Sequence, residues 1–183
     1  MTTLHIPTLD TDRLILRAPT GDDAGPYADF YSSDHSSYVG GPLSEELAWR
    51  ELAKEAGHWI LRGYGRWSVV ERSTGTWVGM TGLWFPKGWP EPEIGWVLAP
   101  AATGKGYATE AATAARTYAY ETLGWTTVIS LVATDNAPSA AVATRMGATP
   151  DGPFRHERYG DMTIYRHLGP DALDNDGSVE AYA

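Results

Sequence analysis

The segment "APAATGKGYATEAATAARTYAY", from Ala99 to Tyr120, decides the fold of this chain. Gly104 and Gly106 flank Lys105 in a loop, and an alanine-rich stretch of helical composition follows. The first N–H groups of a helix have no partner inside it, and the aligned peptide dipoles make this end positive. Without a Cβ at the glycines, several N–H groups can converge on one anion. The segment predicts an anion site, with a tight turn before a helix as the alternative.

Two familiar phosphate-binding motifs fit this loop poorly. A Walker loop requires glycine where Ala99 stands, and Ser or Thr where Gly106 follows Lys105. The dinucleotide fingerprint G-x-G-x-x-G requires glycine at Thr109. A nucleotide phosphohydrolase is therefore disfavoured.

The remainder of the chain alternates strand and helix patterns. β-Branched or apolar runs that end at Gly or Pro predict strands, whereas a capping residue before apolar residues at helical spacing predicts a helix. The expected elements are a strand over 11–19, helices over 20–32 and from Ser44, a hairpin over 66–85, a strand over 93–100, the alanine-rich helix to Gly124, a strand over 126–134, a helix over 136–146, and strands over 148–155 and 161–168. The second helix is expected to bury Trp49, Leu52, Ala56 and Trp59. This order predicts a mixed sheet with helices on both faces.

Composition narrows the class of protein. The 183 residues fit one domain, expected over 1–169, before an acidic tail over 170–183 that we expect to be loosely ordered. The chain has no cysteine, no secretory signal and no apolar run of membrane-spanning length, so we expect a cytoplasmic protein without a membrane partner. The net charge of −9 argues against nucleic acid as a partner, and the five histidines show no metal-ligand spacing.

Three stretches together resemble a known family. They are "TDRLILRAPTGDDA" from Thr11, "EIGWVLAPAATGKGYATEA" from Glu93 and "NAPSAAVATRMGA" from Asn136. In order and spacing they are similar to the GNAT superfamily of acetyl-CoA-dependent N-acetyltransferases, in particular its ribosomal-protein N-acetyltransferase (RimJ/RimL-like) branch. The resemblance runs from about Thr11 to Leu168. It implies an α/β (mixed α+β) fold whose central sheet is mixed, mostly antiparallel and six- to seven-stranded.

The resemblance also implies a coenzyme site. In the family, the signature Q/R-x-x-G-x-G/A binds the coenzyme A pyrophosphate through backbone amides. Thr103 stands at the Q/R position, Gly106 at the glycine and Ala108 at the small residue, so a long polar side chain is lost while the amides remain. The preceding strand splays from its neighbour in the family and bonds the pantetheine arm. The implied acetyl-CoA contacts are Val97, Leu98, Ala99, Thr103, Gly104, Lys105, Gly106, Tyr107, Ala108, Asn136 and Ser139.

Carboxylates before the loop are candidates for the general base. Glu93 aligns with a glutamate that removes the amine proton in some members, directly or through water. The alternatives are that Glu93 only pairs with a neighbouring arginine, or that Glu91 acts instead. At pH 7, freeing an α-amine of pKa ~7.7–8.0 costs about 1 kcal/mol, whereas a lysine amine at ~10.4 costs nearly 5. An α-amine or activated small amine therefore needs little help.

The candidate general acid is less well defined. Asn136 and Ser139 match an N-x-x-S pattern in which the asparagine bonds the pantetheine arm and the serine lies near the sulfur. Many members carry a tyrosine seven residues after this asparagine as the acid, but here the residue is Ala143. Ser139 or a water is left for this role, and Asn136 is also expected to cap its helix.

The proline-rich segment "LWFPKGWPEP" is expected to lie near the acceptor groove. Trp84 and Trp89, with Tyr38, are the candidate acceptor contacts; the alternatives are packing within the domain or a dimer contact. The sequence thus predicts an N-acetyltransferase, monomer or homodimer, that moves acetyl from acetyl-CoA to a small amine or a protein N-terminus. The alternative is a degenerate member that binds acetyl-CoA without transferring the acetyl group.

Overall fold

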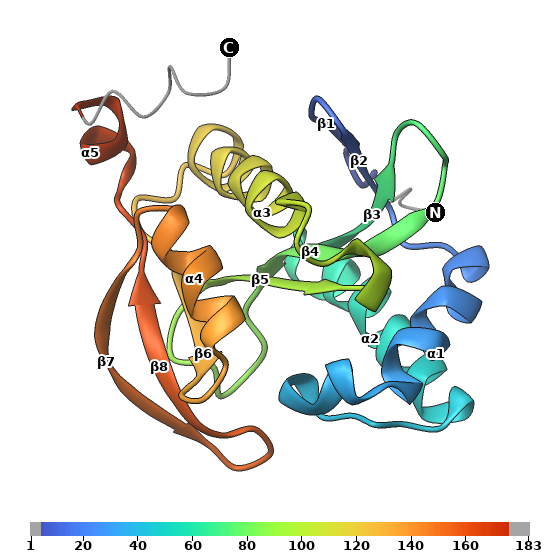
Figure 1. Ribbon diagram of the computed structural model, residues 1–183. Coiled ribbons are helices and arrows are strands. Elements are labelled where there is room, and N and C mark those ends of the chain that lie inside the picture. Colours follow the sequence, from blue (N-terminus) through green and yellow to red (C-terminus); the bar gives the residue numbers. More distant parts are fainter. Residues whose placement is uncertain (1–4, 176–183) are drawn as a thin grey trace.

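A computed structural model describes residues 5–175 and contains one eight-stranded sheet. The strand order is β1-β2-β3-β4-β5-β6-β8-β7 (Figure 1). The strands are β1 Leu9–Asp10, β2 Leu14–Arg17, β3 Arg66–Glu71, β4 Trp77–Trp84, β5 Glu93–Leu98, β6 Ile129–Ala133, β7 Thr149–His156 and β8 Gly160–Arg166. Every pairing is antiparallel except that of β5 with β6. The expected mixed, mostly antiparallel sheet is confirmed, and the two-residue β1 raises the strand number above the expected six to seven.

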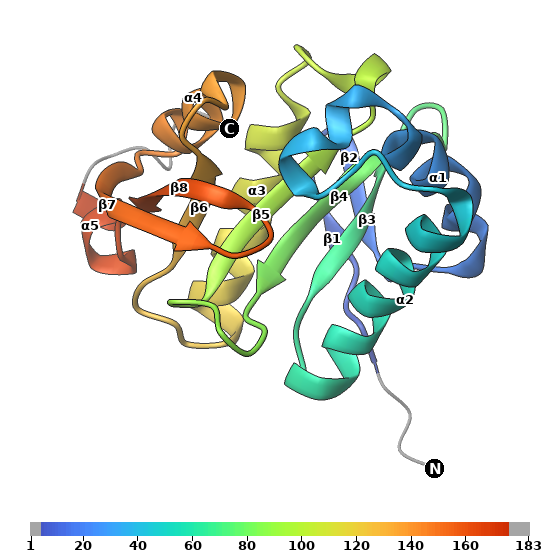
Figure 2. The same ribbon diagram turned by 90° about the horizontal axis from the view of Figure 1, so that it is seen from below.

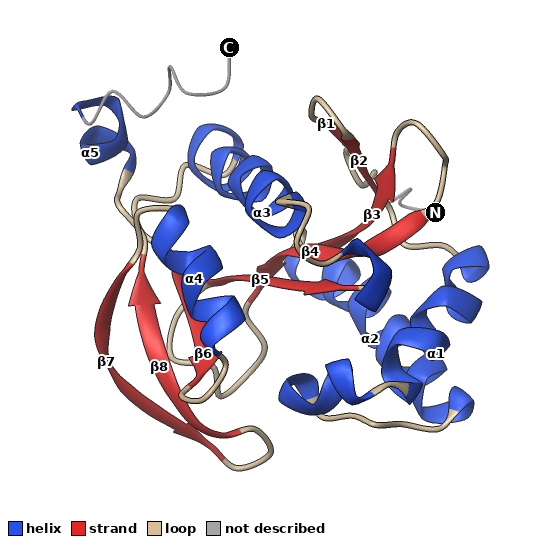
Figure 3. Ribbon diagram, in the orientation of Figure 1, coloured by secondary structure: helices blue, strands red, loops and turns tan. Residues whose placement is uncertain are grey.

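Helices cover both faces of the sheet, as Figure 3 shows. The helices α1 and α2 lie on one face, and α3 and α4 lie on the other; Figure 2 gives the view from the α1–α2 side. Their bounds are α1 Ala24–Ser32, α2 Glu45–Arg62, α3 Tyr107–Thr117, α4 Ala137–Arg145 and α5 Pro170–Asn175. The alanines of α3 explain its close approach to the sheet, since Ala111, Ala112 and Ala115 are at most 1% exposed.

The buried face of α2 differs from the expected one. Trp49 is 59% exposed, and the face turned to the sheet carries Ala48, Leu52, Glu55 and Trp59. These four positions have the i, i+4, i+7, i+11 spacing of one helical face. The prediction for Trp49 was wrong because the face includes a carboxylate, Glu55, which pairs with an arginine beneath the helix.

The beginning of the expected tail is ordered as α5, which covers Pro170–Asn175. The rest of that tail lies outside the described residues. Across the described part of the chain, none of the helices is both long and apolar enough to cross a membrane.

The strands β5 and β6 separate soon after they meet. Their only ladder pair is Glu93 with Ile129, although both strands continue beyond it. At the point of separation, the Ser130 hydroxyl donates to the Ile94 carbonyl at 2.7 Å and accepts from His167 Nε2 at 2.9 Å. This Ser130 contact replaces a backbone partner for the carbonyl. The separated strands leave a gap in the sheet that α-helices of both layers flank.

Candidate active site

The glycine loop presents free backbone donors. Gly104 and Gly106 have φ angles of +75° and +82°, in the left-handed region that favours glycine. Within the described residues, the N–H groups from Gly104 to Ala108 have no protein acceptor, and the first helical bond here is that of Glu110 N–H to Gly106 O at 3.1 Å. If protein acceptors already occupied these N–H groups, the loop could not bind an anion. No such acceptor is found in the described part of the chain.

An arginine far away in sequence holds this loop. Arg13 Nη1 donates to the Lys105 carbonyl at 2.9 Å, and its Nε donates to Glu110 Oε2 at 2.7 Å. Glu110 also accepts from the Thr11 hydroxyl at 2.6 Å. Sequence reasoning missed these contacts, and no local signal joins residues about a hundred positions apart. The bonds attach the loop to the strand end before β2, so the free N–H groups have a defined direction.

A cleft of about 1030 Å³ opens over the loop. Eight of the eleven predicted coenzyme contacts line it: Val97, Leu98, Thr103, Gly104, Gly106, Ala108, Asn136 and Ser139. Thr109, which was not predicted, also lines the cleft, and its buried hydroxyl has no partner within residues 5–175. Free amides together with an unpartnered hydroxyl suit a diphosphate.

Three predicted contacts lie elsewhere. The Ala99 N–H donates to Val78 O at 2.9 Å, so this amide is already used. The Lys105 ammonium lies 5.7 Å from the centre of the Tyr107 ring, and the Tyr107 hydroxyl bonds to Glu71 on the far side. Neither residue lines the cleft, and their backbone N–H groups have no protein acceptor among the described residues.

A second, smaller cavity of about 90 Å³ lies where β5 and β6 separate. The predicted acceptor contacts Trp84, Trp89 and Tyr38 line it, and so does Glu93, the candidate base. The two cavities share six lining residues: Tyr38, Val39, Trp96, Val97, Asn136 and Ser139. The tertiary structure thus brings the predicted acceptor and coenzyme residues to one junction.

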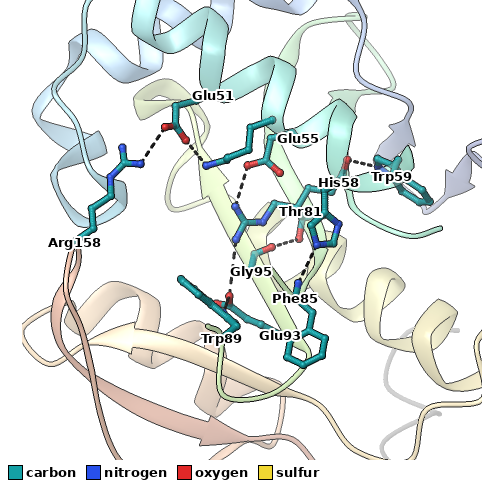
Figure 4. A network of polar contacts seen from close by, with 12 residues as sticks. Glu51, Glu55, His58, Trp59, Thr81, Phe85, Trp89, Glu93, Gly95 and Arg158 are labelled. Atoms are coloured by element: carbon teal, nitrogen blue, oxygen red, sulfur yellow. Dashed lines mark hydrogen bonds and ion pairs between the residues drawn. The ribbon is translucent and has the colours of Figure 1, made fainter. Parts of the chain in front are cut away.

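Glu93 is buried at this junction. It is 4% exposed, and its Oε2 accepts from Trp89 Nε1 at 2.7 Å; Figure 4 shows these two side chains next to each other. Its Oε1 accepts from the Leu131 N–H at 3.3 Å. Burial raises the pKa of Glu93, and Arg66 at 4.0 Å together with these two hydrogen bonds opposes the rise. A carboxylate with a raised pKa is a better proton acceptor than an ordinary one.

Glu91, the competing candidate base, is committed to another role. Arg166 contacts both of its carboxylate oxygens, at 2.6 and 2.9 Å, and these hydrogen bonds lower the pKa of Glu91. It does not line either cavity. The geometry therefore favours Glu93 over Glu91.

A buried ion pair between Arg66 and Glu55 lies next to Glu93. Arg66 Nη1 lies 3.2 Å from Glu55 Oε1, and the two side chains are 19% and 1% exposed. Glu55 Oε2 and Arg66 Nε have no partner among the described residues. Sequence reasoning missed this pair, although one signal existed: Glu55 falls on the helical face of Leu52 and Trp59, and a carboxylate at such a position is paired when buried.

Asn136 and Ser139 lie at the start of α4. Asn136 Oδ1 accepts from the Ser139 N–H at 3.2 Å, so the expected helix cap is present. Ala143, where the family resemblance implied a tyrosine as general acid, is fully buried. Four tyrosines from other elements, Tyr27, Tyr31, Tyr38 and Tyr159, line the smaller cavity.

The separated strands β5 and β6, the glycine loop with free amides and the two adjoining cavities form a candidate site for an anionic ligand beside a second, smaller binding site. Comparison with known proteins then gives the family. The Acetyltransferase (GNAT) domain family matches residues 13–149, more than half of the chain. The chain belongs to the GNAT family of acetyltransferases.

Similar proteins span nearly the whole chain. The protein described as "Uncharacterized N-acetyltransferase YoaA" from Bacillus subtilis is 29% identical over 163 residues, covering 87% of this chain and 92% of that protein. The crystal structure of an acetyltransferase from Agrobacterium tumefaciens is 37% identical, with a TM-score of 0.81, and covers 91% of this chain and 97% of that one. A putative ribosomal-protein-serine acetyltransferase from Vibrio cholerae shares the fold, with 24% identity, a TM-score of 0.76, and coverage of 91% and 99%.

Proposed function

We propose that this protein is an acetyl-CoA-dependent N-acetyltransferase that acetylates a primary amine by direct attack within a ternary complex. The observation that carries the proposal is the meeting of the two cavities at Ser139 and Asn136, with Glu93 on one side and the glycine loop on the other. The fold similarity to a ribosomal-protein acetyltransferase is compatible with the RimJ/RimL-like branch. The cytoplasm stays our prediction for its compartment, since the chain has no cysteine.

The residues of the larger cleft fit coenzyme A. The free N–H groups from Gly104 to Ala108 and the Thr109 hydroxyl would hold the pyrophosphate, and the exposed edge of β5 at Val97 and Leu98 would hold the pantetheine arm. When bound, acetyl-CoA supplies an acetyl thioester as the acyl donor. Hydrogen bonds to a charged group contribute roughly 1.5–3 kcal/mol each, so three or four of them suffice for a stable complex.

Glu93 is assigned the role of base. Its carboxylate would accept the proton of the attacking amine, directly or through one water, while Arg66 and the Trp89 indole partly oppose the rise of its pKa that burial causes. Holding the amine beside the coenzyme cleft supplies the remaining rate enhancement, because a well-oriented pair reacts without the entropy cost of encounter. Ser139, which lies on both cavities, or a water is the candidate donor of a proton to the leaving thiolate.

A thermal-shift series with acetyl-CoA, coenzyme A and ATP tests the coenzyme. A ligand at 100 times its Kd stabilises the fold by about 2.7 kcal/mol. We expect acetyl-CoA and coenzyme A to raise Tm and ATP to have no effect at the same concentration. Stabilisation by ATP alone would contradict the choice of coenzyme.

A degenerate acetyl-CoA-binding protein is the second candidate, because Ala143 replaces the tyrosine of many relatives. Coenzyme A release with a panel of amines separates the two. Release above the rate of the amine-free control supports the enzyme, whereas binding without release supports the degenerate protein.

A further inference from the structure

One arginine joins the two walls of the smaller cavity. Arg158 lies in the turn between β7 and β8, and its Nη1 contacts Glu51 Oε1 on α2 at 3.1 Å. Its guanidinium also lies against Gly40, where a Cβ would be 2.9 Å from Arg158 Nε and where φ is +92°. Figure 4 shows the side chain extending from the hairpin to α2. The positive φ favours glycine at this position, and three chain segments meet at Arg158.

The bridge between Arg158 and Glu51 connects two elements that contribute to the cavity, although it is their neighbours Tyr159 and Lys54, and not the bridge residues themselves, that line it. On the hairpin side the cavity is lined by Tyr159 and Met162, and on the opposite side by Tyr38, Val39 and Lys54. A bond from Arg158 to Glu51 therefore links the β7–β8 wall to the α2 wall. The cavity has about 90 Å³, against about 1030 Å³ for the coenzyme cleft. An extended peptide spans ~3.3–3.6 Å per residue, so an acceptor that continues beyond its first residue needs open space between these two walls.

The charged side chains that line the cavity differ in whether they are paired with other groups of the protein. Lys54 pairs with Glu51, and Arg66 lies between Glu55 and Glu93. The two cations that line the cavity are therefore both engaged with carboxylates of the protein. Glu55 Oε2 and Arg66 Nε both lack a partner among the described residues, and both atoms are buried, so the guanidinium stays shared between its two carboxylates. The other lining side chains include the aromatic residues Tyr27, Tyr31, Trp84, Trp89 and Tyr159. Such a lining suits a cationic amine and offers no free cation to a carboxylate on the acceptor.

We propose that the acceptor is a small amine without a carboxylate, and that the Arg158–Glu51 bridge excludes protein N-termini. This inference rests on the proposed N-acetyltransferase function and selects between its two acceptor classes. Arg158 then determines which acceptors enter, because its bond to Glu51 fixes the β7–β8 hairpin to α2. It touches neither the coenzyme cleft nor Glu93.

The test measures coenzyme A release with paired acceptors. Each pair consists of a small amine, such as 2-phenylethylamine or a diaminoalkane, and a tripeptide amide whose first residue carries the same side chain; free phenylalanine adds a carboxylate to the first pair. We expect kcat/KM for at least one small amine to exceed that of its tripeptide and of the amino acid by tenfold or more. A wild-type preference for tripeptides or for the amino acid overturns the inference and leaves the acetyltransferase function standing. No release with any acceptor overturns both.

The variants Arg158→Ala and Glu51→Gln test the bridge itself. Both should raise the kcat/KM ratio of tripeptide to small amine by about tenfold, through KM rather than kcat. The matched control is Arg155→Ala, which removes the exposed pair with Asp161 on the same hairpin and should leave the ratio within twofold. Unchanged Tm in all three variants keeps folding out of the comparison. An unchanged ratio in Arg158→Ala overturns the assignment of the bridge.

Discussion

The Trp89 indole N–H donates to Glu93 Oε2 at 2.7 Å, which joins the proline-rich loop to the candidate base. The loop residue and the base are four positions apart, on either side of Glu91 and two prolines. On the opposite side of the base lies Arg66, at 4.0 Å. The pKa of Glu93 therefore depends on residues from other elements, and two of them, Trp89 and Glu55, give predictions of opposite sign.

Trp89→Phe keeps the ring and removes the donor. The hydrogen bond lowers the pKa of Glu93, so its loss raises that pKa further. Because the base must be ionised, the acidic limb of the kcat/KM profile should move to higher pH by about one unit, the equivalent of ~1.4 kcal/mol. Trp125→Phe, which changes a tryptophan outside both cavities, serves as the control. An acidic limb that stays in place would contradict the role of Glu93.

Glu55→Gln should move the same limb in the opposite direction. The charge of Glu55 raises the pKa of Glu93 and also occupies Arg66 at 3.2 Å. Its removal leaves the guanidinium to Glu93 alone, so the pKa of Glu93 falls and activity persists to lower pH. A pH–rate profile of both variants checks the signs. If the acidic limb moved in the same direction in Trp89→Phe and Glu55→Gln, this account of the network would be refuted.

Gly106→Ala separates backbone strain from coenzyme binding. Gly106 and Gly124 have φ angles of +82° and +69°, so alanine at either position costs roughly 1–2 kcal/mol of folding free energy. Only Gly106 belongs to the loop of free amides, and a Cβ there would lie 3.3 Å from Arg13 Nη2. We expect Gly106→Ala to weaken acetyl-CoA binding at least tenfold by calorimetry, and Gly124→Ala to leave the Kd unchanged. Equal losses of affinity in both would mean that the loop has no special role.

Thr109→Val tests the unpartnered hydroxyl of the cleft. A hydrogen bond to a ligand is worth ~0.5–1.5 kcal/mol net, so the Kd for acetyl-CoA should rise by about three- to tenfold. Stability without ligand should not fall, because the hydroxyl has no protein partner to lose. Thr117→Val, on an exposed position of α3 outside the cleft, is the matched control. An unaltered Kd for Thr109→Val would place the pyrophosphate elsewhere.

Asp23→Ala should destabilise the fold in a pH-dependent way. Asp23 is 1% exposed and accepts from Arg17, Ser68 and the Thr20 N–H, at 2.6–2.9 Å. Burial alone raises its pKa, but these hydrogen bonds outweigh burial and the pKa is lowered. Its stabilisation is therefore present above the unfolded-state pKa of ~3.9 and is lost as pH falls through the lowered folded value.

Urea unfolding at pH 7 and near pH 2 measures the effect. Loss of one partner of a buried ion pair costs about 3–5 kcal/mol, which is the expected difference at pH 7, and it should shrink at the lower pH. Asp22→Ala, at the exposed neighbouring position, is the control. A loss that is the same at both pH values would show that packing, not charge, stabilises this site.

Much of the fold could be predicted because its signals are local. The hairpin of β3 and β4, the strand β5 and the start of α3 after Gly106 follow from short patterns of side-chain period, capping and glycine placement. Local patterns were not sufficient for Trp49. Helical spacing predicted the helix correctly, but it could not decide which of two neighbouring helix faces packs on the sheet. That choice depended on Glu55 and its partner across the layer.

The sequence by itself determined that a strand, a two-glycine loop and an alanine-rich helix follow one another, since each depends only on residues within a few positions. Tertiary structure alone decided that Arg13 would hold Lys105, that Glu55 and Arg66 would lie beneath Glu93, and that Arg158 would reach Glu51. The packing of α3 on β1 and β2 brings Arg13 to Lys105, and the packing of α2 on β3 brings Glu55 to Arg66. The number of residues between such partners is not fixed by the contact. The sequence therefore contains no regular spacing from which the contact could be predicted.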